Sequence, residues 1–140
     1  MSVDVDTSFT QFTRTAERAA NQLISAYTTS FGLATRLLGP RHRQHVRNIY
    51  ALVRVADELV DGVTAEAGLS RRQQSEALDH FVDETHRALE LGYSSDLIIH
   101  AFAQTARAAG IDAKNGSTSE ASMPAARAVC AKAWMMRSLL

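Results

Sequence analysis

The sequence has little cysteine, no net charge and no long hydrophobic run. Its only cysteine, Cys130, excludes a framework of intramolecular disulfides and is typical of a reducing compartment. Fifteen basic residues balance fifteen acidic ones, so overall charge gives no reason to expect a nucleic-acid partner. No apolar run approaches the roughly 18 residues of a membrane span, and the acidic start lacks the order of a signal peptide. We therefore expect a cytoplasmic protein, with peripheral membrane contact as the alternative.

Strand patterns are missing as well, because no segment alternates apolar and polar residues with a period of two. Apolar residues instead recur at helical spacing, and helices are predicted at residues 14–27, 31–38, 41–61, 71–91 and 96–109. The predicted fold is all-α. Its parts are a loose N-terminus at 1–13, a helical domain at 14–113 and a linker-like, poorly ordered tail at 114–140.

The segment 48–62 is the most informative part of the chain. Four polar residues share one stripe of the predicted helix, at i, i+4, i+7 and i+11: Tyr50, Arg54, Asp57 and Asp61. Aliphatic side chains cover most of the remaining surface, which inverts the usual amphipathic helix. A helix of this kind is expected to be buried, so its polar stripe must face a partner helix, a water-filled cleft or a charged ligand.

Two aspartates four residues apart can share a divalent cation between their carboxylates. Mg²⁺ suits Asp57 and Asp61 because it often takes one or two protein carboxylates together with waters and phosphate oxygens. Arg54 could hold the same phosphate as a bidentate donor. The alternative is an ordinary helical ion pair between Arg54 and Asp57 with nothing bound. The apolar flanks of the stripe argue against that alternative, since a solvated ion pair does not need them.

Three other patterns have simpler explanations. The hydroxyl cluster Thr28–Ser30 can serve as the N-terminal cap of the helix that follows it. The basic segment 41–47 could attract phosphate or an anionic membrane surface, but it is short and more typical of a solvated first turn. Its pair His42 and His45 has no third metal ligand at a suitable spacing. A second pair of aspartates, Asp79 and Asp83, flanks a single apolar stripe, as on an ordinary surface helix.

Residues from about 20 to 112 resemble the squalene and phytoene synthase family, the head-to-head prenyl diphosphate synthases. Three pieces carry the resemblance: Thr28–Phe31, Ile49–Asp61 and His100–Phe102. The middle piece is the most specific, because Tyr and Arg precede the two aspartates at fixed offsets. In detail the chain looks most similar to bacterial phytoene synthases. The resemblance implies the N-terminal half of an isoprenoid-synthase-type helical bundle.

The resemblance also implies roles for particular residues. Asp57 and Asp61 match the metal-binding aspartates that hold Mg²⁺, or alternatively Mn²⁺, against the substrate diphosphate. Arg54 matches a diphosphate-binding arginine, and Tyr50 matches an active-site tyrosine near the reacting carbons. The matching substrate-binding segment consists of Tyr27, Thr28, Thr29, Ser30 and Phe31. The family usually has a lysine in that segment, and this sequence lacks it.

The activity implied is the joining of two prenyl diphosphates, either geranylgeranyl or farnesyl diphosphate, through a cyclopropyl intermediate. A phytoene-type product would place the chain in carotenoid and isoprenoid biosynthesis. Family members are about twice as long and carry a second Asp-rich motif that nothing in this sequence supplies. We therefore expect a fragment, shifted in frame or truncated near Lys114, that is inactive alone. The alternatives are a non-catalytic prenyl-lipid-binding or assembly protein with this fold, and a helical interaction module with a structural Arg54–Asp57 pair.

Overall fold

The computed structural model describes residues 2–27 and 39–108. Those residues contain helices and turns but no strand, so the all-α prediction is confirmed. The helices are α1 (Ser2–Tyr27), α3 (Pro40–Asp61), α4 (Val63–Glu66), α5 (Arg71–Leu91) and α6 (Leu97–Ala108). The predicted helix at 31–38 and the predicted tail at 114–140 lie outside the described residues.

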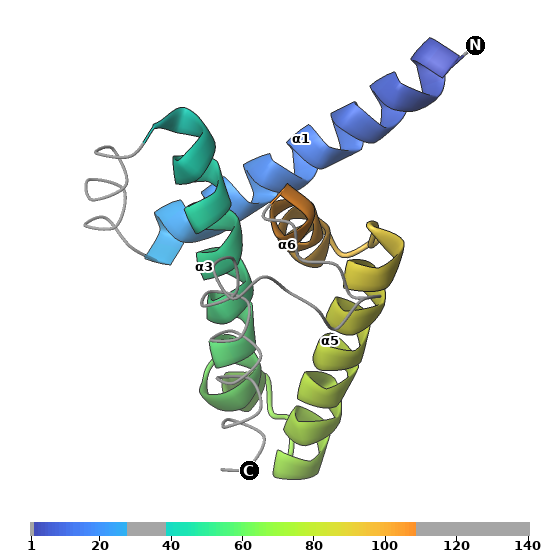
Figure 1. Cartoon of the computed structure of the whole chain (residues 1–140). Helices are drawn as coiled ribbons and strands as arrows, with labels where there is room; N and C mark the ends of the chain where they lie inside the picture. The colour runs from blue at the N-terminus through green and yellow to red at the C-terminus, as the bar shows by residue number, and fades with distance from the viewer. Residues whose placement is uncertain (1, 28–38, 109–140) are drawn as a thin grey trace, which may run out of the picture.

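Helix α3 lies at the centre of the described fold and contacts α1, α4, α5 and α6. Figure 1 shows α3 and α5 running antiparallel to each other, with α6 near the end of the pair where α1 crosses. Small and aliphatic residues at Ala51, Leu52 and Ala56 are buried at these contacts. The polar stripe predicted on α3 is therefore carried by a helix whose other sides are fixed by packing.

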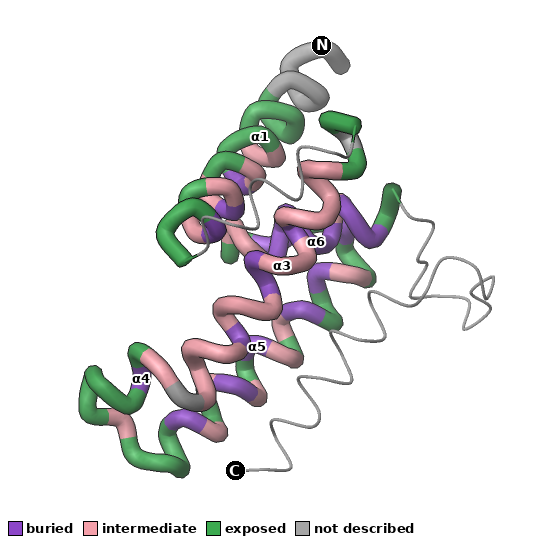
Figure 2. The backbone as a smooth tube through the Cα atoms, turned by 90° about the vertical axis from the view of Figure 1, so that its left-hand side faces the viewer, coloured by how far each residue is buried: buried purple, intermediate pink, exposed green. Residues whose placement is uncertain are grey.

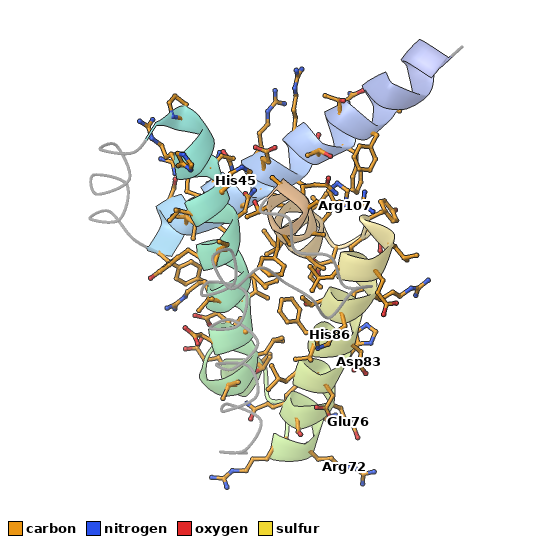
Figure 3. The ribbon with its side chains drawn as sticks, in the orientation of Figure 1. His45, Arg72, Glu76, Asp83, His86 and Arg107 are labelled. Atoms are coloured by element: carbon orange, nitrogen blue, oxygen red, sulfur yellow. The ribbon has the colours of Figure 1, made fainter. Side chains whose placement is uncertain are left out.

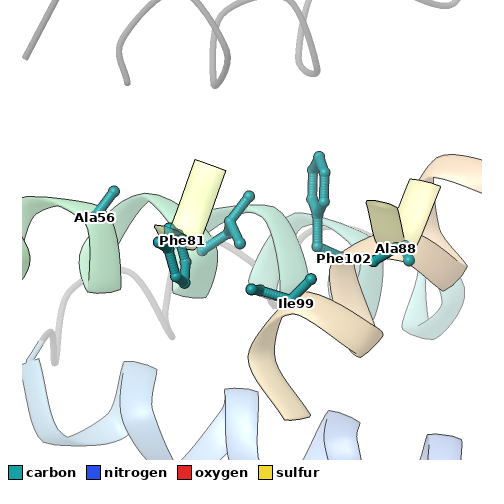
Figure 4. Packing of buried hydrophobic residues seen from close by; sticks show 7 residues of the cluster. Ala56, Phe81, Ala88, Ile99 and Phe102 are labelled. Atoms are coloured by element: carbon teal, nitrogen blue, oxygen red, sulfur yellow. The ribbon is translucent and has the colours of Figure 1, made fainter. Parts of the chain in front are cut away.

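Two apolar clusters hold α3 in this position. The first joins α3, α5 and α6, and Figure 4 shows its packing; its buried members are Leu52, Ala56, Phe81, Ala88, Ile99, Phe102 and Ala103. The second joins α1, α3 and α6, and its buried members are Ala16, Ala20, Ile24, Ala51 and Ala101. Alanine dominates the second cluster, and small side chains at a crossing let helix axes approach closely. In Figure 2 the buried positions of α1 face α3 and α6, while its other side is exposed.

The N-terminus differs from the prediction of a loose segment at 1–13, because α1 begins at Ser2. The aromatic rings of Phe9 and Phe12 lie 5.5 Å and 4.7 Å from the ring centroid of His100 on α6. Thr13 hydrogen-bonds to the same histidine. These contacts are distant in sequence, so the local composition of the segment gave no sign of them.

The start of α3 also differs from a solvated basic turn. Gln44 exchanges hydrogen bonds of 3.1 Å and 3.2 Å with Asn21 of α1 and donates another to Asn48. Asn48 in turn donates to Thr105 of α6 at 2.9 Å. His45, labelled in Figure 3, lies 3.0 Å from the same threonine hydroxyl. A polar network therefore links the three helices at the end of α3 that precedes the stripe.

Helix α5 begins and ends where the sequence predicted, because both ends carry local signals. The Ser70 hydroxyl accepts a hydrogen bond from the Gln73 backbone, and the Gln73 side chain accepts one from the Ser70 backbone. At the other end Gly92 adopts the left-handed conformation, with φ of 74°. The predicted loop at 63–70 contains one turn of helix, α4, tied to α5 by a hydrogen bond from Gln74 to Thr64.

His100 is fully buried and serves as a neutral hydrogen-bonding group. Its Nδ1 atom accepts a hydrogen bond of 3.2 Å from the Ser94 backbone N–H, which can only donate. The proton of the neutral ring is therefore on Nε2, which lies 3.0 Å from the Thr13 hydroxyl. Burial lowers the pKa of His100 below its ordinary value.

Folding stability is therefore expected to decrease as the pH falls below about 6.5. In the unfolded chain His100 titrates near its ordinary pKa of about 6.5, so between that pH and the lower folded pKa only the unfolded state takes up the proton. The contribution of neutral His100 to the free energy of unfolding is complete above about pH 6.5. Below that pH it decreases by at most about 1.4 kcal/mol per pH unit. Urea unfolding at several pH values measures this slope. It should be smaller in His100→Gln and unchanged in the control His86→Gln, whose histidine is exposed on α5.

Candidate active site

Arg54 is the best-defined residue of the predicted site. Its guanidinium carbon lies 4.2 Å from the ring centroid of Tyr27, the last residue of α1, in a cation–π contact. Its Nη2 atom forms an ion pair with Glu58. Its Nε atom is buried and has no hydrogen-bond partner among the residues that the structure describes. The fold thus brings together two predicted site residues that are far apart in the sequence.

Glu58 was not among the predicted site residues. The ion pair found for Arg54 is with Glu58 at i+4, whereas the sequence alternative named Asp57 at i+3. The only sequence signal for the Arg54–Glu58 pair was its i, i+4 spacing, which many ion pairs on helix surfaces share. The Arg54 and Glu58 side chains are 33% and 18% exposed, so the pair is more buried than the Arg72–Glu76 pair on α5, at 89% and 64%.

The other predicted residues fall into two groups. Tyr50 and Asp57 are partly buried on α3, and Tyr50 packs against the alanine-rich cluster between α1, α3 and α6. Asp61 is the last residue of α3, and its side chain is not described. The residues Thr28, Thr29, Ser30 and Phe31 lie outside the described residues. The assignment of a cleft shared by both aspartates and Ser30 stays a prediction.

The positions of Asp57 and Asp61 along α3 suit the predicted magnesium site, which stays a prediction. The helix is continuous from Pro40 to Asp61, so Asp57 and Asp61 are one turn apart on the same side. Two carboxylates leave coordination positions for the waters and phosphate oxygens that Mg²⁺ retains. Among the residues that the structure describes, none supplies an acceptor to the buried Nε of Arg54 on the same stripe, and an anion could supply one.

Within the described segments 2–27 and 39–108, no three His, Cys, Asp or Glu side chains gather into a group that could hold a metal ion. His42 is exposed, and the Nδ1 atom of His45 is occupied by Thr105. The second aspartate pair lies on α5, where Figure 3 shows Asp83 near His86. Asp83 is exposed and Asp79 is partly buried. The interpretation of this pair as structural stays a prediction.

A pocket of about 520 Å³ lies between α3, α5 and α6, but on a different side of α3. Its lining includes Val55 and Leu59, which are roughly 130° and 170° around the helix from the centre of the polar stripe. Its polar lining residues come from α5 and the segment before α6: His80, Glu84, Arg87, Tyr93, Ser95 and Asp96. This pocket is therefore separate from the candidate active site.

Comparisons with known proteins identify the family of the chain, whereas the roles of the site residues stay a prediction. Residues 24–117 match the family profile of squalene/phytoene synthase, which includes Tyr27 and the whole of α3. Searches of curated proteins and of solved structures gave no match. In the described part of the chain, no helix has the length and apolar character needed to cross a membrane. The family profile covers well over half of the 140 residues, and the chain therefore belongs to the squalene/phytoene synthase family.

Proposed function

We propose that this chain carries the first metal–diphosphate site of a head-to-head prenyl diphosphate synthase of the phytoene type. The family binds prenyl diphosphates and condenses them as a prenyltransferase. The substrate proposed here is geranylgeranyl diphosphate, with farnesyl diphosphate as the shorter candidate. Mg²⁺ is the proposed cofactor, Mn²⁺ could replace it, and carotenoid biosynthesis in the cytoplasm, with peripheral membrane contact, is the proposed setting.

The observation that carries the proposal is the state of Arg54. A buried N–H group without an acceptor costs about 1–3 kcal/mol, so its side chain is expected to have a partner that is not part of the described structure. A diphosphate oxygen is such a partner, because guanidinium binds phosphate through charge-assisted hydrogen bonds. The carboxylates of the same stripe would bind the divalent cation that accompanies a diphosphate.

The chain's own residues would act by holding the leaving group. Arg54 would bind the diphosphate and stabilise the negative charge that develops as the allylic C–O bond breaks. Asp57 and Asp61 would bind Mg²⁺, which when bound supplies Lewis-acid stabilisation of the same charge. Tyr50, partly buried near the centre of α3, would lie beside the prenyl carbons. The aliphatic sides of α3 would help to keep water away from the carbocation.

Arg54→Gln is expected to weaken binding of geranylgeranyl diphosphate, measured calorimetrically in the presence of Mg²⁺, by about tenfold or more. Losing a hydrogen bond to a charged group costs about 1.5–3 kcal/mol, and about 1.4 kcal/mol corresponds to a factor of ten. The matched control is Arg72→Gln, which removes an exposed arginine from an equally spaced Arg–Glu pair.

Equal affinity of Arg54→Gln and wild type would contradict the proposal. Binding that persists without Mg²⁺ and is insensitive to Arg54 would favour the alternative of a non-catalytic prenyl-lipid-binding protein. In that case the prenyl chain, rather than the diphosphate, would supply the affinity.

A further inference from the structure

Glu58 makes two contacts at once. One carboxylate oxygen, Oε1, pairs with Nη2 of Arg54. The other, Oε2, accepts a hydrogen bond of 2.9 Å from the backbone N–H of Val63, the first residue of α4. A carboxylate has two acceptor oxygens for two such donors, whereas a side-chain amide has one acceptor oxygen and a donor NH₂ group. Glu58 therefore connects Arg54 to the turn that follows Asp61.

The helical spacing alone does not account for this arrangement. On a helix, an acidic residue N-terminal to a basic one is the more favourable order, and here the arginine comes first. The Arg72–Glu76 pair has the same order and spacing, but Glu76 is largely exposed, at 64%. The greater burial of Glu58 and its backbone contact distinguish it from an ordinary surface partner.

Gly62 leaves the space that the Glu58 carboxylate occupies. A Cβ atom at Gly62 would lie 2.7 Å from the carboxyl carbon of Glu58 and 3.1 Å from its Cα atom. The first of these distances is too short for two carbon atoms, so any other residue at position 62 would displace the carboxylate. The backbone atom cannot move away easily, since it belongs to α3. The glycine immediately after Asp61 is thus required by the position of the Glu58 side chain.

We propose that Glu58 is a positioning residue for Arg54, and that Gly62 is the residue that makes this position possible. Tyr27 covers the face of the guanidinium, while Glu58 fixes its edge. A free arginine side chain would have to be ordered on each binding event, and holding it in place beforehand reduces that cost. The role in diphosphate binding rests on the proposed function, whereas the fixing of Arg54 does not.

Charge and positioning predict opposite effects for Glu58→Ala, which makes the proposal testable. Removing a negative charge beside an anion site would by itself strengthen the binding of inorganic pyrophosphate with Mg²⁺. Loss of positioning should instead weaken that binding by about tenfold. This is the lower end of the effects usually seen when a contact that supports a binding residue is removed. Glu58→Gln loses the same charge but keeps one acceptor, so its affinity should lie between those of Glu58→Ala and wild type. The control Glu76→Ala should leave the affinity unchanged, and unchanged or tighter binding in Glu58→Ala would overturn the proposal.

A second measurement does not depend on any ligand. The Nε–H resonance of Arg54 in ¹H–¹⁵N NMR spectra should be sharp and slow to exchange in the wild-type chain. It should broaden or disappear in Glu58→Ala and in Gly62→Ala, while helix content stays unchanged. Gly39→Ala is the matched control, because no atom lies within 4 Å of a Cβ built there. A sharp Arg54 signal in both variants would show that Glu58 does not position it, even if wild type binds no pyrophosphate and the proposed function itself fails.

Discussion

Incubation of residues 1–140 with geranylgeranyl diphosphate and Mg²⁺ is expected to give no detectable C–C coupled product. Two prenyl diphosphates carry several negative charges, and the coupling ionises first an allylic and then a cyclopropyl diphosphate. One aspartate pair with one arginine can hold part of one such group. The family pairs this motif with a second Asp-rich motif. Losing a set of catalytic groups of that size commonly lowers the rate by several powers of ten.

We do not expect the second aspartate pair to complete the site. Asp79 and Asp83 are on α5, and the first apolar cluster joins this helix to α3 through Leu52 and Ala56, away from the polar stripe. Extraction of hydrocarbons after the incubation tests this expectation, with an active family member as the positive control. Phytoene formed by the wild-type chain, and lost in Asp57→Ala and Asp61→Ala, would show that a single aspartate pair is sufficient.

Asp57→Asn and Asp61→Asn are each expected to lower the Mg²⁺-dependent affinity for pyrophosphate by about a hundredfold. The substitution keeps the size of the side chain and removes its charge. A contact with a charged group contributes up to about 3 kcal/mol, and that energy corresponds to a factor of about one hundred in affinity. Asp57 is only partly buried on α3, so its replacement removes no core side chain. Calorimetric titration with pyrophosphate at fixed Mg²⁺ measures the effect.

The control for these two variants is Asp83→Asn, which neutralises an exposed aspartate of the other pair. Its affinity should equal that of wild type. If Asp83→Asn weakened binding as much as Asp57→Asn, the effect would come from general loss of negative charge rather than from a site on α3.

The fold was predictable where local signals decide it. The bounds of α5 follow from the Ser70 cap and from Gly92, and α3 follows from the uninterrupted helical pattern between Pro40 and Gly62. The N-terminal part of α1 was not predictable, because it is fixed by contacts of Phe9 and Phe12 with His100, about ninety residues away in the sequence. Long-range packing of this kind leaves no periodic signal.

The sequence predicts the residues of the candidate site but not the contacts between them. The stripe on α3 placed Arg54 and Asp57 on one side of one helix, and the structure has them on a single continuous helix. The contact between Tyr27 and Arg54 depends on how α1 packs on α3, and the role of Glu58 depends on the turn at Gly62. Neither follows from spacing, since both need atoms from another element.

The most direct test of the site on α3 is paramagnetic broadening by Mn²⁺ in the presence of pyrophosphate. Mn²⁺ can occupy oxygen-ligand sites of the magnesium type, and it broadens the NMR signals of nearby amide groups. Broadening is predicted to centre on the last two turns of α3, around Asp57 and Asp61, and to be absent at Asp79 and Asp83 of α5. Broadening centred on α5, or spread evenly over the acidic residues of the surface, would contradict the assignment of the metal–diphosphate site to α3.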